Sequence, residues 1–196
     1  KIIENIAGRI KSFRSPELRI NSDTVKALEK TGFSIDSSVS SQRFDGPLSY
    51  GTSMKLNWLN APRGPYTPSR NNPFRKGRSN ILEIPVSALI FPYITTTMRI
   101  SPPIFRSLEN YLLKESINKN QPVVLLTHPN ECIFEKQSQH WKSSGLTSFF
   151  RDNLRTKLKL KNLGIKAIKQ LEITLSKAKA KNFEFVSMQK YSKQHK

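Results

Sequence analysis

The chain has 196 residues, enough for one domain with a sizeable core, and 36% of them are hydrophobic, a low fraction that still lies outside the disordered range. No apolar run approaches the roughly 18 residues that cross a bilayer, nothing at the start resembles a signal peptide, and the single cysteine, Cys132, excludes an internal disulfide. The net charge of +19 is compatible with nucleic acid, an anionic membrane surface or an acidic polymer as partner.

The first part of the chain predicts a helix between two short strands. Residues 1–10 have the apolar spacing of a helix but no capping residue before it, so we expect the sequence to begin in mid-fold. Residues 11–16 predict a strand closed by a proline. Residues 21–32 predict a helix with a capping residue at its start and a glycine at its end. The alternating apolar residues of 33–39 predict a second strand.

A long irregular segment, 40–80, precedes the next predicted strand. It is rich in Pro, Ser, Asn and Gly and is too long for an ordinary connection, so it is either functional or disordered. Its aromatic residues Tyr50, Trp58 and Tyr66 argue against disorder. Residues 80–90 then predict a strand.

The second half of the chain predicts two further helix–strand pairs. Prolines in the first turn and an apolar stripe predict a helix at 101–120, and the apolar run at 122–128 predicts a buried strand. An irregular insert, 130–160, precedes an amphipathic helix at 162–182 and a last strand at 183–188. We expect five apolar residues of that helix to face inward: Ile165, Ile168, Leu171, Ile173 and Leu175.

Single apolar strands alternate with helices along the chain, which is typical of an α/β fold with a parallel sheet, either open or closed into a barrel. In both versions, reactive groups gather at the carboxyl ends of the strands. Three polar residues end or follow a predicted strand: Arg14, Asp36 and His128. We expect their side chains to share one rim.

The chemistry of these three side chains is compatible with hydrolysis. His128 can act as a general acid or base near neutral pH. Asp36 is the carboxylate that would hold its ring, and Arg14 could fix an anionic group or a second carboxylate through two hydrogen bonds. The alternative is that His128 only caps the end of a strand and bonds to the backbone.

The sequence lacks the pattern of a metal site. A catalytic zinc ion needs about three protein ligands, with histidines usually among them. Besides His128, the chain has only His140 in the polar insert and His195 beside the C-terminus, and no H-x-x-x-H or H-E-x-x-H spacing. The nucleophile elbow, the Walker loop and the dinucleotide fingerprint are also absent.

Much of the positive charge lies near the C-terminus. From Lys136 onward, fifteen Lys or Arg residues face three Asp or Glu residues, so this part supplies +12 of the net charge of +19. Such runs usually form a solvated face. Aromatic residues do not alternate with these lysines as they do in a groove for single-stranded nucleic acid, so nucleic acid is not the expected partner.

Five segments, in this order, resemble the polysaccharide deacetylase family, the NodB-homology domain of carbohydrate esterase family four. They are FRSPELRIN with its R-x-P motif, LEKTGFSIDSSV, the pair YGTSMKLNWLNAPRGPYTPS and ILEIPVSAL, LLTHP with an L-x-x-H motif, and FEFVSMQKY. Together they make residues 5–190 similar to that family over most of their length. The insert of this chain is the part with the least similarity.

The resemblance implies a distorted (β/α)7 barrel with parallel strands, of which residues 1–196 would be the C-terminal portion of a single domain. In that family an Asp and two His, from motifs that precede R-x-P, hold a divalent metal, expected to be zinc. Only thirteen residues precede Arg14, so the N-terminal βα units, with the metal ligands and the catalytic-base Asp, would be absent from this chain. Alone, the chain is therefore expected to be inactive.

The resemblance also implies roles for individual residues. His128 would be the general acid that protonates the leaving amine, and Leu125 would help to line the acetyl pocket. Arg14, in the same motif as Pro16, would orient the missing aspartate base, and Asp36 would be the carboxylate that tunes the acid histidine. A substrate wall would consist of Trp58, Arg63 and Tyr66.

Three functions remain open at this point. The first is metal-dependent removal of N-acetyl groups from a polysaccharide or amino sugar. The second is a non-catalytic relative that binds an acidic polymer or nucleic acid through its basic face. The third is an amidase of the same fold that cleaves cyclic ureides or imides. No transmembrane segment is expected. The cytoplasm or the periphery of a membrane is the expected location, and the sequence does not decide between them.

Overall fold

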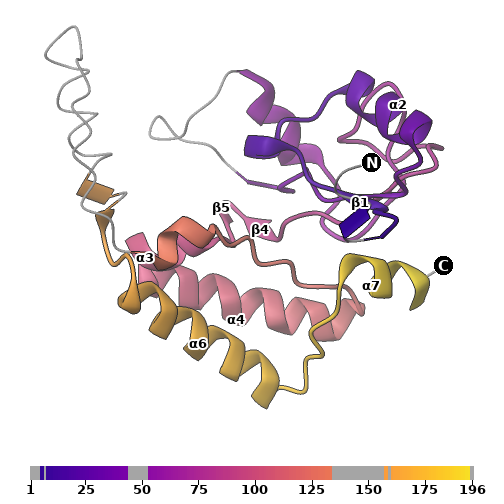
Figure 1. Ribbon diagram of the computed structural model, residues 1–196. Helices are drawn as coiled ribbons and strands as arrows, with labels where there is room; N and C mark the ends of the chain where they lie inside the picture. Colours follow the sequence, from indigo (N-terminus) through magenta and orange to yellow (C-terminus); the bar gives the residue numbers. More distant parts are fainter. Residues whose placement is uncertain (1–4, 7, 44–52, 134–156, 159, 195–196) are drawn as a thin grey trace, which may run out of the picture.

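The computed structural model describes residues 5–6, 8–43, 53–133, 157–158 and 160–194 (Figure 1). This part of the chain is mixed α/β, with a parallel sheet in the order β1–β2–β3 and an antiparallel pair β4–β5. The strands are β1 (Ser12–Phe13), β2 (Ile35–Asp36), β3 (Leu82–Glu83), β4 (Ala88–Leu89) and β5 (Phe91–Pro92). The helices are α2 (Ser22–Thr31), α3 (Thr95–Ile100), α4 (Pro102–Lys119), α6 (Ile165–Ala180) and α7 (Met188–Gln194), with short 3-10 helices η1 (Pro16–Leu18), η2 (Ser53–Asn60) and η3 (Pro129–Cys132).

Helix α2 has the boundaries that its capping residues predict. The side chain of Asn21 accepts a hydrogen bond from the backbone N–H of Thr24 at 2.9 Å, and Gly32 ends the helix with a left-handed φ of 81°. Val25 and Leu28 are buried beneath the helix. The helix connects β1 to β2, which run parallel, as the α/β prediction requires.

The predicted strands are present as shorter pieces. Strand β3 covers only part of the predicted strand at 80–90, because Pro85 cannot donate to a ladder and Ile90 turns the chain with a left-handed φ of 61°. Beyond β3, isolated parallel bridges such as Ser40 to Val86 continue the pairing. Over the described residues, the resulting sheet is parallel, has three strands and is open.

The prediction of a strand at 122–128 is wrong, although the segment is extended. A single parallel bridge joins Leu126 to Ile94. The backbone N–H of Val124 donates to the side-chain hydroxyl of Ser87, and not to a backbone carbonyl as in a strand ladder. The side chains nevertheless alternate as in a strand. Val124 and Leu126 pack into a first hydrophobic cluster, whereas Val123 and Leu125 pack against a second one.

These two clusters divide the core. The first lies around the parallel sheet and consists of Leu18, Ile20, Val25, Leu28, Ile35, Val39, Trp58, Ala61, Phe74, Ile81, Ile84, Val86 and Val124. The second lies along α4 and consists of Tyr93, Met98, Phe105, Leu108 and Leu112. The alternation within 123–126 therefore makes this segment the layer shared by both clusters.

The last predicted strand, 183–188, is also absent. Residues 183–187 have no regular structure, and Met188 is the first residue of α7. The hydroxyl of Ser187 accepts a hydrogen bond from the backbone N–H of Lys190 at 3.1 Å, which is the pattern of a helix cap. Met188 and Tyr191 then pack against the first cluster, so a helix, not a strand, covers this side of the sheet.

Helix α6 forms as predicted, but the prediction of its buried face is wrong. Four of the five apolar residues expected inside are between 40% and 71% exposed, and only Leu171 is partly buried: the exposed ones are Ile165, Ile168, Ile173 and Leu175. The residues that α6 buries are Ala167 and Thr174.

Among the helices described here, none has the length and apolar composition to cross a bilayer.

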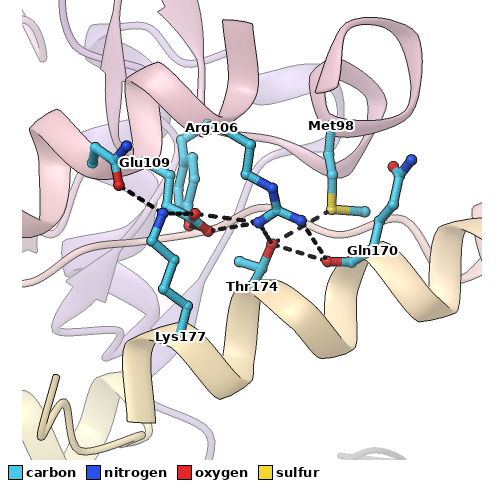
Figure 2. Close-up of polar contacts among 8 residues, drawn as sticks. Met98, Arg106, Glu109, Gln170, Thr174 and Lys177 are labelled. Atoms are coloured by element: carbon cyan, nitrogen blue, oxygen red, sulfur yellow. Dashed lines mark hydrogen bonds and ion pairs between the residues drawn. The ribbon is translucent and has the colours of Figure 1, made fainter. Parts of the chain in front are cut away.

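The reason for this orientation of α6 is a polar network with α4 (Figure 2). Glu109 of α4 is fully buried, and its carboxylate accepts hydrogen bonds from Lys177 at 2.6 Å and from Arg106 at 3.2 Å. The guanidinium of Arg106 also reaches the hydroxyl of Thr174 at 3.0 Å. Tyr93 donates to Glu109 from the core side, and burial together with this carboxylate raises the pKa of the tyrosine.

We predict that Glu109→Ala destabilises the protein by about 3–5 kcal/mol, because it leaves the cations of Arg106 and Lys177 without their buried counter-charge. The measurement is the free energy of unfolding in urea. The matched control is Glu172→Ala on the exposed face of α6, which should change stability by less than about 0.5 kcal/mol. Equal effects of the two substitutions would contradict the role given to the network.

Candidate functional site

Three polar side chains meet at the carboxyl ends of β1, β2 and β3. Arg14 follows the last residue of β1, Asp36 is the last residue of β2, and Glu83 is the last residue of β3. The parallel register pairs Asp36 directly with Glu83. The structure therefore brings together Arg14 and Asp36, two of the three residues expected at the rim, and adds a carboxyl group.

Arg14 holds the chain immediately after Asp36. Its Nε donates to the carbonyl oxygen of Ser37 at 2.9 Å, and a terminal nitrogen donates to the Ser37 hydroxyl at 2.7 Å. Burial lowers the pKa of Arg14, while the nearby carboxyl groups of Glu83 and Asp36 act in the opposite direction. The guanidinium remains charged, because its ordinary pKa lies far above neutral pH.

The two carboxyl groups are among the most deeply buried charged groups in the described residues, each with 1% exposure. Oδ1 of Asp36 accepts the backbone N–H of Ser37 at 2.9 Å and the hydroxyl of Ser38 at 2.6 Å. Oε1 of Glu83 accepts the backbone N–H of Val39 at 2.9 Å. Burial raises the pKa of both carboxyl groups, and the charge of Asp36 raises that of Glu83 further.

Glu83 was missed as a site residue in the reasoning from sequence. Its signal was present, since a glutamate interrupts the apolar run of the strand predicted at 80–90. A charged residue in a strand that is buried on both faces needs a partner. Only the pairing of β2 with β3 identifies that partner as Asp36.

His128 lies at the start of η3 and is exposed. Its backbone N–H donates to the hydroxyl of Thr95 at 3.4 Å, and its carbonyl oxygen accepts the N–H of Glu131 at 3.0 Å. Among the residues that the structure describes, no hydrogen bond or ion pair joins its imidazole to Arg14 or Asp36. A common pocket for the three side chains stays a prediction.

The loop that carries His128 is fixed by a second residue that the sequence reasoning missed, Glu131. Its buried carboxylate accepts hydrogen bonds from Thr96 at 2.6 Å, from Arg99 at 2.6 Å and from the hydroxyl of Thr95. Burial opposes the ionisation of Glu131, but these donors outweigh it and lower its pKa. The hydroxyl of Thr95 thus contacts both Glu131 and the backbone of His128.

The predicted substrate wall is part of the folded scaffold. Trp58 is buried under the guanidinium of Arg43, which lies 5.2 Å from the ring centroid. Arg63 forms an ion pair with Glu115 through two hydrogen bonds. The buried hydroxyl of Tyr66 donates to a backbone carbonyl at 2.6 Å. A contact of Trp58, Arg63 or Tyr66 with a substrate stays a prediction.

Two further predicted site residues lie in different surroundings. Leu125 is partly buried against the second hydrophobic cluster, beside α4. Pro16 is exposed and begins η1, directly after the strand end that carries Arg14. Tyr50, His140 and His195 lie outside the described residues.

The described part of the chain does not fit a metal site. Within the described ranges, no three His, Cys, Asp or Glu side chains are placed to hold a metal ion. The carboxyl groups of Asp36 and Glu83 and the imidazole of His128 do not form such a set. No chemical step is therefore assigned to a metal in this chain.

The chain was compared with models of protein families, with curated proteins and with solved structures, and none of them matches.

We predict that Glu131→Gln destabilises the protein at neutral pH and that the difference from the wild type shrinks in acid. A lowered pKa in the folded state contributes stability that is present above the unfolded value of about 4.3 and is lost as pH falls through the folded pKa. The measurement is the free energy of unfolding of both proteins between neutral pH and about pH 3. A difference that does not depend on pH would contradict an ionised Glu131.

Proposed function

We propose that this chain is the C-terminal portion of a hydrolase that removes N-acetyl groups from a polysaccharide or amino sugar. The observation that carries the proposal is the meeting of Arg14 with Asp36 at the ends of neighbouring parallel strands. These residues belong to the FRSPELRIN and LEKTGFSIDSSV segments, on which the resemblance to polysaccharide deacetylases depends. In this proposal, the parallel sheet belongs to a distorted (β/α)7 barrel.

Arg14 and Asp36 would serve the reaction by orientation. The guanidinium of Arg14 is already fixed by Ser37, so its position does not have to be acquired when substrate binds. A fixed guanidinium beside a strand end can orient a second carboxylate, as the family resemblance implies for the catalytic base. The complete site would therefore include a carboxylate contributed from outside this chain.

His128 would supply the proton for the leaving group. Hydrolysis of an amide releases an amine, and the nitrogen must gain a proton as its bond to the carbonyl carbon breaks. The exposure of His128 allows contact with a polymer, and its backbone is held on both sides by hydrogen bonds to Thr95 and Glu131. A general acid fixed in this way is typically worth ~10²–10⁴ in rate.

In the complete protein to which the chain would belong, we predict that His128→Ala lowers kcat for deacetylation by about 10²–10⁴-fold, because the leaving amine loses its proton donor. The assay is the release of acetate from an oligomer of N-acetylglucosamine. His140→Ala, in the insert, is the control and should leave the rate unchanged. Full activity of the His128 variant, or no acetate release by the wild-type protein, would refute the proposal.

The 196-residue chain by itself should release no acetate from the same oligomer, even with zinc or cobalt added, because its described residues form no ligand set for a metal. The measurement is the same acetate assay at high protein concentration. Deacetylation by the chain alone would show that the missing groups are not required.

A further inference from the structure

The buried pair of Asp36 and Glu83 poses a problem of charge. The two residues are register partners on adjacent parallel strands, and both are 1% exposed. If both were ionised, two negative charges would lie side by side in a poorly solvated interior, with the single positive charge of Arg14 nearby. Such an arrangement is avoided when one of the two carboxyl groups keeps its proton.

The hydrogen bonds around the pair indicate where a proton is needed. Oδ1 of Asp36 has two donors, whereas Oδ2 is buried and receives no N–H or hydroxyl group from any described residue. The other nearby donors point elsewhere. Arg14 donates to Ser37, and the hydroxyl of Tyr66 donates to the carbonyl of Pro73. The group that remains to satisfy Oδ2 is the carboxyl of Glu83, the register partner of Asp36 on the adjacent strand, which can donate to it only when it is protonated.

We propose that Glu83 keeps its proton at neutral pH and donates it to Asp36, so that the pair carries one negative charge and Glu83 acts as a positioning residue for Asp36. The significance of this arrangement for catalysis rests on the proposed function. The position of the proton on Glu83 does not depend on that function, because it follows from the strand register, the burial of the two side chains and their hydrogen-bond donors.

The two carboxyl groups differ in a way that assigns the proton to Glu83. Asp36 accepts two hydrogen bonds from Ser37 and Ser38, and each stabilises its charged form. Glu83 accepts one, from the backbone of Val39. Burial raises the pKa of both carboxyl groups, and the rise is large for Glu83, because the charge of Asp36 adds to the effect of burial there. Arg14 favours the charged form of both groups and Tyr66 is a neutral neighbour.

A protonated Glu83 would fix Asp36 in two ways. Its O–H···O hydrogen bond holds Oδ2, while Ser37 and Ser38 hold Oδ1, so the carboxylate cannot rotate. The remaining single charge is balanced by Arg14. The ends of β2 and β3 would then carry one rigid, ionised carboxylate instead of two that repel each other, which is the kind of preorganisation that an active site requires.

The direct test is a titration of the wild-type chain with ¹³C-labelled glutamate side chains, followed by NMR. The carboxyl carbon of Glu83, identified by its loss in Glu83→Gln, should have the shift of a protonated acid at pH 7. Glu29, ion-paired with Arg70 at the surface, should be ionised at the same pH and provides the internal control. A carboxylate shift for Glu83 at pH 7 would overturn the inference.

A second measurement compares the stability of the wild type with that of Glu83→Gln, whose amide can donate to Asp36 but cannot ionise. A raised pKa gives the folded wild type a stability that is present below about pH 4.3 and is lost as pH rises through the folded pKa. Between about pH 4.3 and the folded pKa of Glu83, the ratio of folded to unfolded wild-type protein should fall with pH. Relative to the same ratio for Glu83→Gln, the decrease should be up to tenfold per pH unit. A constant ratio would contradict the proposal.

The variant Asp36→Asn separates this inference from the proposed function. Removing the charge of Asp36 should shift the titration midpoint of Glu83 toward lower pH, whether or not the protein has deacetylase activity. An unchanged midpoint would overturn the sharing of a proton.

In the complete enzyme, Glu83→Gln should retain most of kcat, whereas Glu83→Leu should lower kcat with little change in KM. Equal kcat for these two variants would contradict a positioning role.

Discussion

The parallel register of β1, β2 and β3 is the constraint on which the candidate site depends. It places Asp36 beside Glu83 and brings the end of β1, with Arg14, to the same edge of the sheet. The hydrophobic cluster around the sheet excludes water from this edge, so the charges of these side chains can be balanced only by one another. A shift of β3 by one residue would move Glu83 to the opposite face and separate the two carboxyl groups.

The rest of the described chain is joined to this sheet through one extended segment and several buried polar contacts. Residues 123–126 contribute alternate side chains to the two hydrophobic clusters and so couple α4 to the sheet. Glu131 fixes the loop of His128 to α3, and Glu109 fixes α6 to α4. Buried ion pairs of this kind contribute little net stability compared with apolar residues, but they penalise any other arrangement of the helices.

The functional proposal combines one geometric fact with one resemblance. Arg14 and Asp36 lie at the ends of neighbouring parallel strands, where Arg14 is bonded to Ser37, and the resemblance to polysaccharide deacetylases is proposed from the segments that contain them. The aromatic and basic residues expected to contact substrate, Trp58 and Arg63 among them, are engaged in packing and ion pairs of the scaffold. The chemistry proposed for this chain therefore concentrates on the strand ends and on His128.

The sequence by itself determined α2, α4 and the extent of α6, because capping residues and apolar stripes act between neighbours along one helix. It also identified Arg14 and Asp36 as residues at strand ends. Only the tertiary structure decided which face of α6 is buried, that 183–188 is not a strand, and that Glu83 and Glu131 belong near the site. These features depend on partners from distant parts of the chain, and local periodicity carries no information about such partners.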